Sequence, residues 1–184
     1  MKKVLTVLLL LLVITGCNKT EINYAYDIVS YPVDMSGYEG VNSTQHQFKR
    51  ITVDQLFNVI DNKSSAVFYL GRTNCQCCQI CIKYLNNVAT DLGVTVYYID
   101  VYDKDMPLTD EALCDKLKTY IYEILDVEDG EKVLQTPTVF SVINGEFGGS
   151  IICTRNITFS KPATQAQEKR LIKEYKKILK PFAQ

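Results

Sequence analysis

The sequence predicts an α/β fold in which a mixed central sheet is flanked by helices. Three observations carry this prediction. A C-x-x-C motif, Cys75 to Cys78, directly follows a short apolar run and opens a helical pattern. Strand-like and helix-like segments alternate before and after it. Near the end of the chain, Asn144-Gly145 separates two strand-like runs, which is typical of a type I′ hairpin.

The first half of the folded body is predicted to be parallel. Residues 47–51 indicate a short strand, Thr52 begins a capping box for a helix, and residues 66–70 indicate a buried central strand. The following helix ends at Gly93, and residues 94–101 form another strand. The apolar stripe of that helix consists of Cys78, Cys81, Ile82, Leu85, Val88, Ala89 and Leu92. Strand, helix and strand at this spacing form a right-handed βαβ unit.

The second half is predicted to add a helix, a hairpin and a last helix. Residues 109–124 carry a helical pattern that Thr109 would cap. The hairpin strands are residues 138–143 and 146–153, and a second capping box at Thr164 opens the last helix. The order β-α-β-α-β-α-β-β-α therefore joins a βαβ half to a ββα half on one sheet.

The N-terminus has the pattern of an export signal. Lys2 and Lys3 precede the apolar run 4–14, which is too short for the ~20 residues of a membrane span. Ile14-Thr15-Gly16-Cys17 resembles the lipobox of bacterial lipoproteins. We expect residues 1–16 to be a signal peptide, residues 17–45 a lipidated Cys17 with a tether, and residues 46–184 one domain.

Composition excludes several classes of function. The net charge of −1 does not favour a nucleic-acid partner. The only histidine, His46, lies outside any motif, so hydrolysis by a Ser-His or Cys-His pair has little support. Six cysteines remain besides Cys17, and an oxidising compartment would permit them to form disulfides.

Element order, the C-x-x-C motif and the dipeptide Thr136-Pro137 together resemble the thioredoxin-like superfamily over residues 47–181. More narrowly, residues 68–72 leading into Cys75 are similar to the thioredoxin-like subgroup labelled bacteriocin-transport accessory proteins. That label describes a genetic neighbourhood more than a chemistry. We therefore carry over only the fold and the redox site.

The resemblance and the position of the cysteines assign the same roles. Cys75 would be the nucleophile, because a helix start stabilises a thiolate. Cys78, one turn further on the buried face, would be the resolving thiol. The resemblance also implies that Pro137 is a cis-proline and that it binds substrate together with Thr136.

The site departs from the family pattern at several positions. The chain has no tryptophan, Gln76-Cys77 stands between the two cysteines, and Tyr69 occupies the place of the family's buried carboxylate. Cys77 and Cys81 are candidate accessory thiols, although Cys81 lies on the apolar stripe, where a free cysteine often packs as a small hydrophobic residue. Four cysteines within seven residues could also bind a soft metal, but a helix would separate Cys75 from Cys81.

These observations predict a membrane-anchored, extracytoplasmic thiol-disulfide oxidoreductase. Its partners would be exported proteins with cysteines or disulfides, an electron-transfer partner, and the bacterial cell membrane that holds the lipid of Cys17. We expect no cofactor and no resident metal. Two alternatives remain open at this point: a non-catalytic thioredoxin-like binding lipoprotein and a thiolate metal-binding protein.

Overall fold

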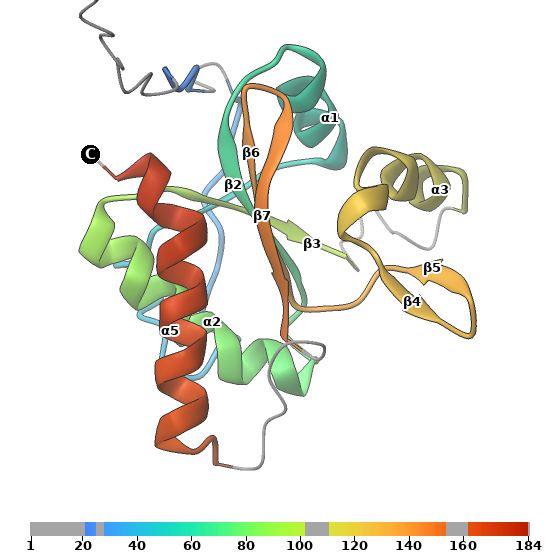
Figure 1. Cartoon of the computed structure of the whole chain (residues 1–184). Coiled ribbons are helices and arrows are strands. Elements are labelled where there is room, and N and C mark those ends of the chain that lie inside the picture. The colour runs from blue at the N-terminus through green and yellow to red at the C-terminus, as the bar shows by residue number, and fades with distance from the viewer. Residues whose placement is uncertain (1–20, 25–27, 102–110, 154–161, 184) are drawn as a thin grey trace, which may run out of the picture.

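The computed structural model describes residues 21–24, 28–101, 111–153 and 162–183. The expected signal peptide, Cys17 and the cap at Thr109 lie outside the described residues. The central sheet has five strands in the order β1-β3-β2-β6-β7. Strands β1, β3 and β2 are parallel, whereas β6 and β7 are antiparallel to their neighbours. The predicted mixed sheet is therefore confirmed (Figure 1).

The elements follow the predicted order, with one addition. They are β1 (Phe48–Arg50), α1 (Val53–Asp61), β2 (Ala66–Gly71), α2 (Gln76–Leu92), β3 (Val96–Asp100), α3 (Glu111–Tyr120), the 3-10 turn η1 (Tyr122–Ile124), β4 (Asp126–Glu128), β5 (Glu131–Val133), β6 (Thr138–Ile143), β7 (Glu146–Ile152), α5 (Gln165–Leu179) and the 3-10 turn η2 (Lys180–Phe182). The sequence did not predict the small hairpin β4–β5, whose strands pair only with each other.

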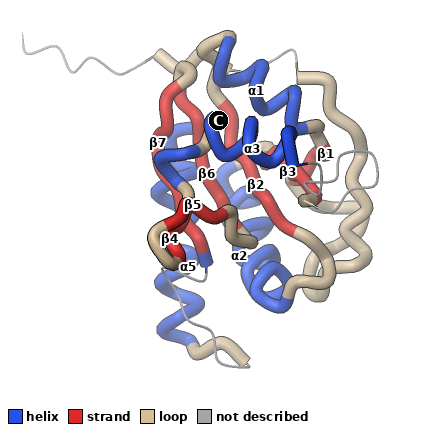
Figure 2. Tube along the Cα trace, turned by 90° about the vertical axis from the view of Figure 1, so that its right-hand side faces the viewer, coloured by secondary structure: helices blue, strands red, loops and turns tan. Residues whose placement is uncertain are grey.

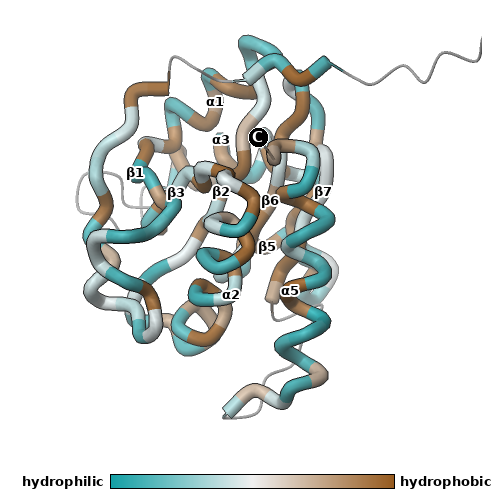
Figure 3. Tube along the Cα trace, turned by 90° about the vertical axis from the view of Figure 1, so that its left-hand side faces the viewer, coloured by the Kyte–Doolittle hydropathy of each residue, from teal (hydrophilic) through white to brown (hydrophobic). Residues whose placement is uncertain are grey.

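Helices cover both faces of the sheet, and each face has its own apolar core. Helices α1 and α3 pack on one face and α2 and α5 on the other, as the two opposite views show (Figures 2 and 3). Strand β2 is buried at every position, so it faces both cores. Val67 and Tyr69 point to the side of α2, while Phe68 and Leu70 point to the side of α1. This alternation follows from the period of two residues in a strand.

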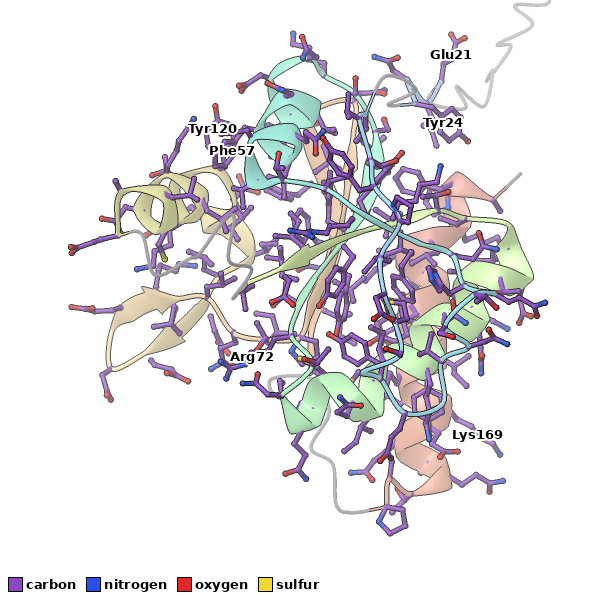
Figure 4. The ribbon with its side chains drawn as sticks, turned by 180° about the vertical axis from the view of Figure 1, so that it is seen from behind. Glu21, Tyr24, Phe57, Arg72, Tyr120 and Lys169 are labelled. Atoms are coloured by element: carbon purple, nitrogen blue, oxygen red, sulfur yellow. A yellow bond between two sulfur atoms is a disulfide. The ribbon has the colours of Figure 1, made fainter. Side chains whose placement is uncertain are left out.

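Helix α1 begins and packs as its sequence predicts. Thr52 and Gln55 form the reciprocal capping box at its N-terminus. On the outer side, the ring of Phe57 contacts that of Tyr120 from α3 at 4.3 Å between centroids (Figure 4). This aromatic contact links α1 to α3 in addition to the core that both helices cover.

Two predicted chain reversals have the expected left-handed backbone. Gly93 ends α2 at φ 64°, a conformation that glycine adopts without a steric penalty. Asn144 and Gly145, with φ of 54° and 85°, join β6 to β7 as the type I′ turn requires. A bulge at Ser141/Val142 shifts the register of that hairpin.

Much of the segment expected to be a tether packs on the domain. Tyr31 pairs with Arg50 through two backbone hydrogen bonds of 2.9 Å, extending the β1 edge. Met35 and Tyr38 are buried in the core beside α2. The folded body therefore starts well before His46.

Candidate functional site

Cys75 lies at the junction of β2 and α2, where the sequence placed it. It is the N-cap of α2, and its Sγ accepts a hydrogen bond from the backbone N–H of Cys78 at 3.2 Å. A side-chain cap satisfies one of the four N–H groups that every helix leaves unpaired at its start. Here the capping atom is the sulfur itself, so the helix start is directly available to stabilise a thiolate.

The dipeptide Thr136-Pro137 lies against Cys75. Its peptide bond is cis, the isomer that the resemblance implied. The Sγ of Cys75 is 3.7 Å from the carbonyl oxygen of Thr136 and 3.8 Å from its hydroxyl. A protonated thiol can donate to the carbonyl, and a thiolate can accept from the hydroxyl. Thr136 therefore offers Cys75 a hydrogen-bond partner whether its sulfur is a thiol or a thiolate.

The two cysteines of the motif have opposite electrostatic environments. The hydrogen bonds that Cys75 receives, above all from the Cys78 thiol and then from the Cys78 N–H and Thr136, lower its pKa to about 5 despite partial burial. The same hydrogen bond and burial raise the pKa of Cys78, which is fully buried. These surroundings favour the thiolate at Cys75 and the protonated thiol at Cys78.

The remaining predicted thiols occupy different surroundings. Cys77 is partly exposed, and burial together with the nearby Cys75 raises its pKa. Cys81, expected to be a free apolar residue or an accessory thiol, is instead in a disulfide with Cys153. The sequence did not predict this pairing, because no local pattern relates two cysteines 72 residues apart. Cys114 is a free, half-buried thiol on α3.

The Cys81–Cys153 disulfide connects α2 to the end of β7, beneath the motif. Both residues are buried, and their Cα atoms are 7.3 Å apart, farther than most protein disulfides span. The N–H of Cys153 also donates to the carbonyl of Pro137 at 3.2 Å. The disulfide therefore holds α2 against the strand that supports the cis-proline.

Gln79 fixes the first turn of α2 to the N-terminal segment. Its side-chain amide donates to the carbonyl oxygens of Gly37 and Thr73 at 2.7 and 2.5 Å and accepts from the N–H of Glu39 at 3.0 Å. A groove of about 490 Å³ is lined by Cys75 together with residues of this segment, α2 and the start of α5, among them Tyr84 and Glu168. No pattern in the sequence predicted this groove.

No metal centre is apparent in the part of the chain that the structure describes. There, no group of three or more His, Cys, Asp or Glu side chains is arranged to hold an ion. Helix α2 places the motif cysteines along its axis, and the disulfide removes Cys81 as a thiolate donor. No described helix has both the length and the apolar character of a membrane span.

Strand order, the position of Cys75 and the cis-proline define a thioredoxin fold with its motif at the expected place. Solved structures similar to the chain include thioredoxin O2 from Arabidopsis thaliana in its oxidised state, with 17% identity, a TM-score of 0.39, and coverage of 58% of this chain and 83% of that one. Oxidised mitochondrial thioredoxin 3 from Saccharomyces cerevisiae has 19% identity and a TM-score of 0.37, covering 56% and 80%.

Oxidised thioredoxin from Plasmodium falciparum aligns over 71% of this chain and 98% of its own, with 11% identity and a TM-score of 0.39. No protein-family model matches the chain, and no curated protein sequence matches it either. At these identities and scores, the structural likenesses carry no argument about activity.

Proposed function

We propose that this protein is a thiol-disulfide oxidoreductase that uses Cys75 and Cys78. The observation that carries the proposal is the Cys75 sulfur, partly exposed at the start of α2, with its pKa lowered to about 5 and the Cys78 N–H 3.2 Å away. Disulfide exchange requires an attacking thiolate and a second thiol close enough to resolve the mixed disulfide, and Cys78 lies one helical turn after Cys75.

The reaction proceeds in two exchanges. The Cys75 thiolate attacks one sulfur of a substrate disulfide, forming a mixed disulfide and releasing the other sulfur as a thiolate that takes a proton from water. Cys78 then loses its proton and attacks Cys75 Sγ. The Cys75–Cys78 disulfide forms, and the second substrate sulfur leaves as a thiolate. Two electrons pass to the substrate, and the reverse sequence oxidises a substrate dithiol.

Thr136 and Pro137 would place a substrate beside the nucleophile. Thr136 is in contact with Cys75, so an extended substrate segment at this dipeptide would bring its sulfur close to Cys75. We assign Thr136 and Pro137 to substrate binding on this basis.

We further propose that the domain acts outside the cytoplasm, anchored through a lipid on Cys17. The support is the basic, apolar and lipobox pattern of residues 1–17. Its substrates would be cysteines of exported proteins, and an electron-transfer partner would reset the pair. Labelling cells with a radioactive fatty acid tests the anchor: wild-type protein should carry the label and Cys17→Ser should not.

Turnover of insulin disulfides in the presence of a dithiol reductant tests the activity. Cys75→Ser should lose turnover, and Cys78→Ser should accumulate a mixed disulfide on Cys75 that mass spectrometry identifies. Cys114→Ser, which removes a free thiol on α3, is the matched control and should retain turnover. Wild-type activity in Cys75→Ser would contradict the assignment, and no turnover in the wild type would favour the non-catalytic binding module.

A further inference from the structure

Helix α5 and the turn η2 that follows it carry a stripe of positive charge on the side away from the core. Leu171, Tyr175 and Ile178 of this helix are buried in the core beside α2. At about 100° per residue, the basic residues fall within about 120° of the opposite side. Most of α5 is hydrophilic in Figure 3. All six basic residues of this stripe, called the basic face below, are exposed: Lys169, Arg170, Lys173, Lys176, Lys177 and Lys180.

The basic face is a local excess of charge. The whole chain has 20 basic and 21 acidic residues, so a generally basic composition does not account for the face. Both acidic residues of α5 lie at its flanks and have partners. Glu168 accepts a hydrogen bond from the hydroxyl of Tyr84, and Glu174 pairs with Lys177 at 2.9 Å.

The stability of the helix does not account for the basic face either. Positive charge near a helix C-terminus complements the macrodipole, but Lys169 and Arg170 lie in the second turn, where the dipole gives them no advantage. Like charges three or four positions apart, such as Lys169 and Lys173, repel each other and destabilise the helix. A continuous row of such charges therefore indicates a surface of opposite charge outside the chain.

The N-terminal segment reaches the C-terminal end of α5. The rings of Tyr24 and Phe182 are in edge contact with their centroids 6.4 Å apart. The carbonyl of Glu21 accepts a hydrogen bond from the side chain of Asn144 at 2.9 Å. Figure 4 labels Glu21 and Tyr24 near this end of the helix and Lys169 toward the other end. The described chain therefore begins beside one end of the basic face.

The position of the expected anchor follows from chain length. Cys17 is four residues before Glu21, and four residues span at most about 14 Å. A lipid on Cys17 would thus hold the C-terminal end of α5 close to a membrane surface. The basic face extends about 17 Å along the helix from Lys169 to Lys180. An array of this length fits a surface of many phosphate groups better than it fits one small anion.

We propose that the basic face of α5 binds the headgroups of anionic phospholipids. This inference rests on the proposed lipid anchor at Cys17. The lipid attaches the protein at one point, and the basic face adds a second attachment that determines which side of the domain faces the membrane. Basic residues near an anionic membrane surface strengthen binding in this way, and salt weakens their effect.

The test uses the intact lipoprotein in vesicles of phosphatidylcholine with or without phosphatidylglycerol. A water-soluble acylating reagent modifies exposed lysines, and peptide mass mapping measures each rate. Lys173, Lys176 and Lys180 should react at least about fivefold more slowly on the anionic vesicles, because each basic residue favours contact by a factor of about five. At about 1 M salt, where the Debye length is about 3 Å, the difference should disappear.

Replacing three of these lysines tests whether the basic face itself makes the contact. In the triple variant Lys173→Gln/Lys176→Gln/Lys180→Gln, the ratio of docked to undocked domain should fall by about 100-fold. Lys169 and Lys177 should then react equally fast on both kinds of vesicle. The replaced side chains are exposed, so the variant should fold, and thermal unfolding checks this.

The matched control removes the same charge elsewhere. In Lys49→Gln/Lys116→Gln/Lys118→Gln the replaced residues lie on β1, at the edge of the sheet farthest from β7, and on α3, which covers the opposite face from α5. This variant should keep the slow reaction of the α5 lysines on anionic vesicles.

Three results would contradict the proposal or its premise. Equal rates for the α5 lysines of the wild type on both vesicles, or protection that the two triple variants keep or lose alike, would overturn the membrane contact. Protection by soluble polyaspartate but not by anionic vesicles would assign the face to an acidic protein and would also overturn it. A purified protein without lipid on Cys17 would instead overturn the anchor.

Discussion

The sulfur of Cys75 is both the N-cap of α2 and the proposed nucleophile. It caps α2 by accepting the N–H of Cys78, and it is the partly exposed atom that would attack a disulfide. The same hydrogen bonds that satisfy the helix start also stabilise the thiolate. The thiol of Cys78 contributes most to the lowered pKa of Cys75, ahead of the Cys78 N–H and Thr136.

At the level of single residues, the pKa shifts predict a selective pH profile for alkylation. Only the thiolate reacts, and the pKa of Cys75 is lowered from 9.0 to about 5, so its rate with iodoacetamide should be flat above about pH 6 and fall tenfold per pH unit below 5. Burial and the nearby Cys75 raise the pKa of Cys77, so its rate should still be rising at alkaline pH where that of Cys75 is flat.

Peptide mass mapping of iodoacetamide-treated protein between pH 4 and 10 measures both thiols in one sample. Cys77, two residues away, is the internal control for the reagent concentration and for access of the reagent to this part of the protein. A Cys75 rate that rises through pH 8 to 9, as for an ordinary cysteine, would show that the helix start does not stabilise its thiolate.

Among the secondary-structure elements, the β6–β7 hairpin has a turn that leaves little room for a side chain at Gly145. Gly145 has a φ of 85°, and an added Cβ would lie 2.9 Å from the carbonyl oxygen of Ile60 and 3.1 Å from Cα of Lys63. Its N–H also donates to the carbonyl of Ser64 at 3.0 Å. The turn is therefore packed against the end of α1, not free in solvent.

Gly145→Ala should lower the free energy of unfolding by about 2–3 kcal/mol, because it combines strained backbone with a clash against main-chain atoms. Gly130→Ala is the matched control, since Gly130 has nearly the same φ of 86° in the β4–β5 turn but no atom within 4 Å of its Cβ position. It should cost about 1 kcal/mol. Equal losses in urea unfolding would argue against close packing of the β6–β7 turn.

At the scale of the whole molecule, the Cys81–Cys153 disulfide joins two elements that are far apart in the sequence. It closes a loop with a sequence separation of 72 residues between α2 and the end of β7. Cross-links over long loops stabilise chiefly by restricting the unfolded chain, and a loop of this length corresponds to about 4 kcal/mol in the chain-entropy model.

Cys153→Ala should therefore lower the free energy of unfolding by about 2–4 kcal/mol under non-reducing conditions. Cys114→Ala, at a free half-buried thiol, should cost far less. Chemical denaturation measures both variants, and non-reducing peptide mapping of the wild type should recover a linked Cys81–Cys153 pair. An unlinked pair in oxidised protein would contradict the prediction.

The sequence by itself determined the order of elements and the place of the motif. The helical stripe through Cys78, the capping boxes at Thr52 and Thr164 and the turn at Asn144-Gly145 are local patterns, and local patterns can be read from one chain. Cys75 followed from its position at the helix start. The hairpin β4–β5 was missed because its short strands lack an apolar period.

Only the tertiary structure decided which distant residues meet. The pairing of Cys81 with Cys153, the packing of Met35 against α2, and the contact between the hydroxyls of Tyr38 and Tyr98 all join segments that are far apart in sequence. No period or spacing encodes such contacts, because they arise when β2, β3 and the N-terminal segment bring their buried faces together. The sequence therefore identified the nucleophile, and the fold supplied the surroundings of the thiol behind it.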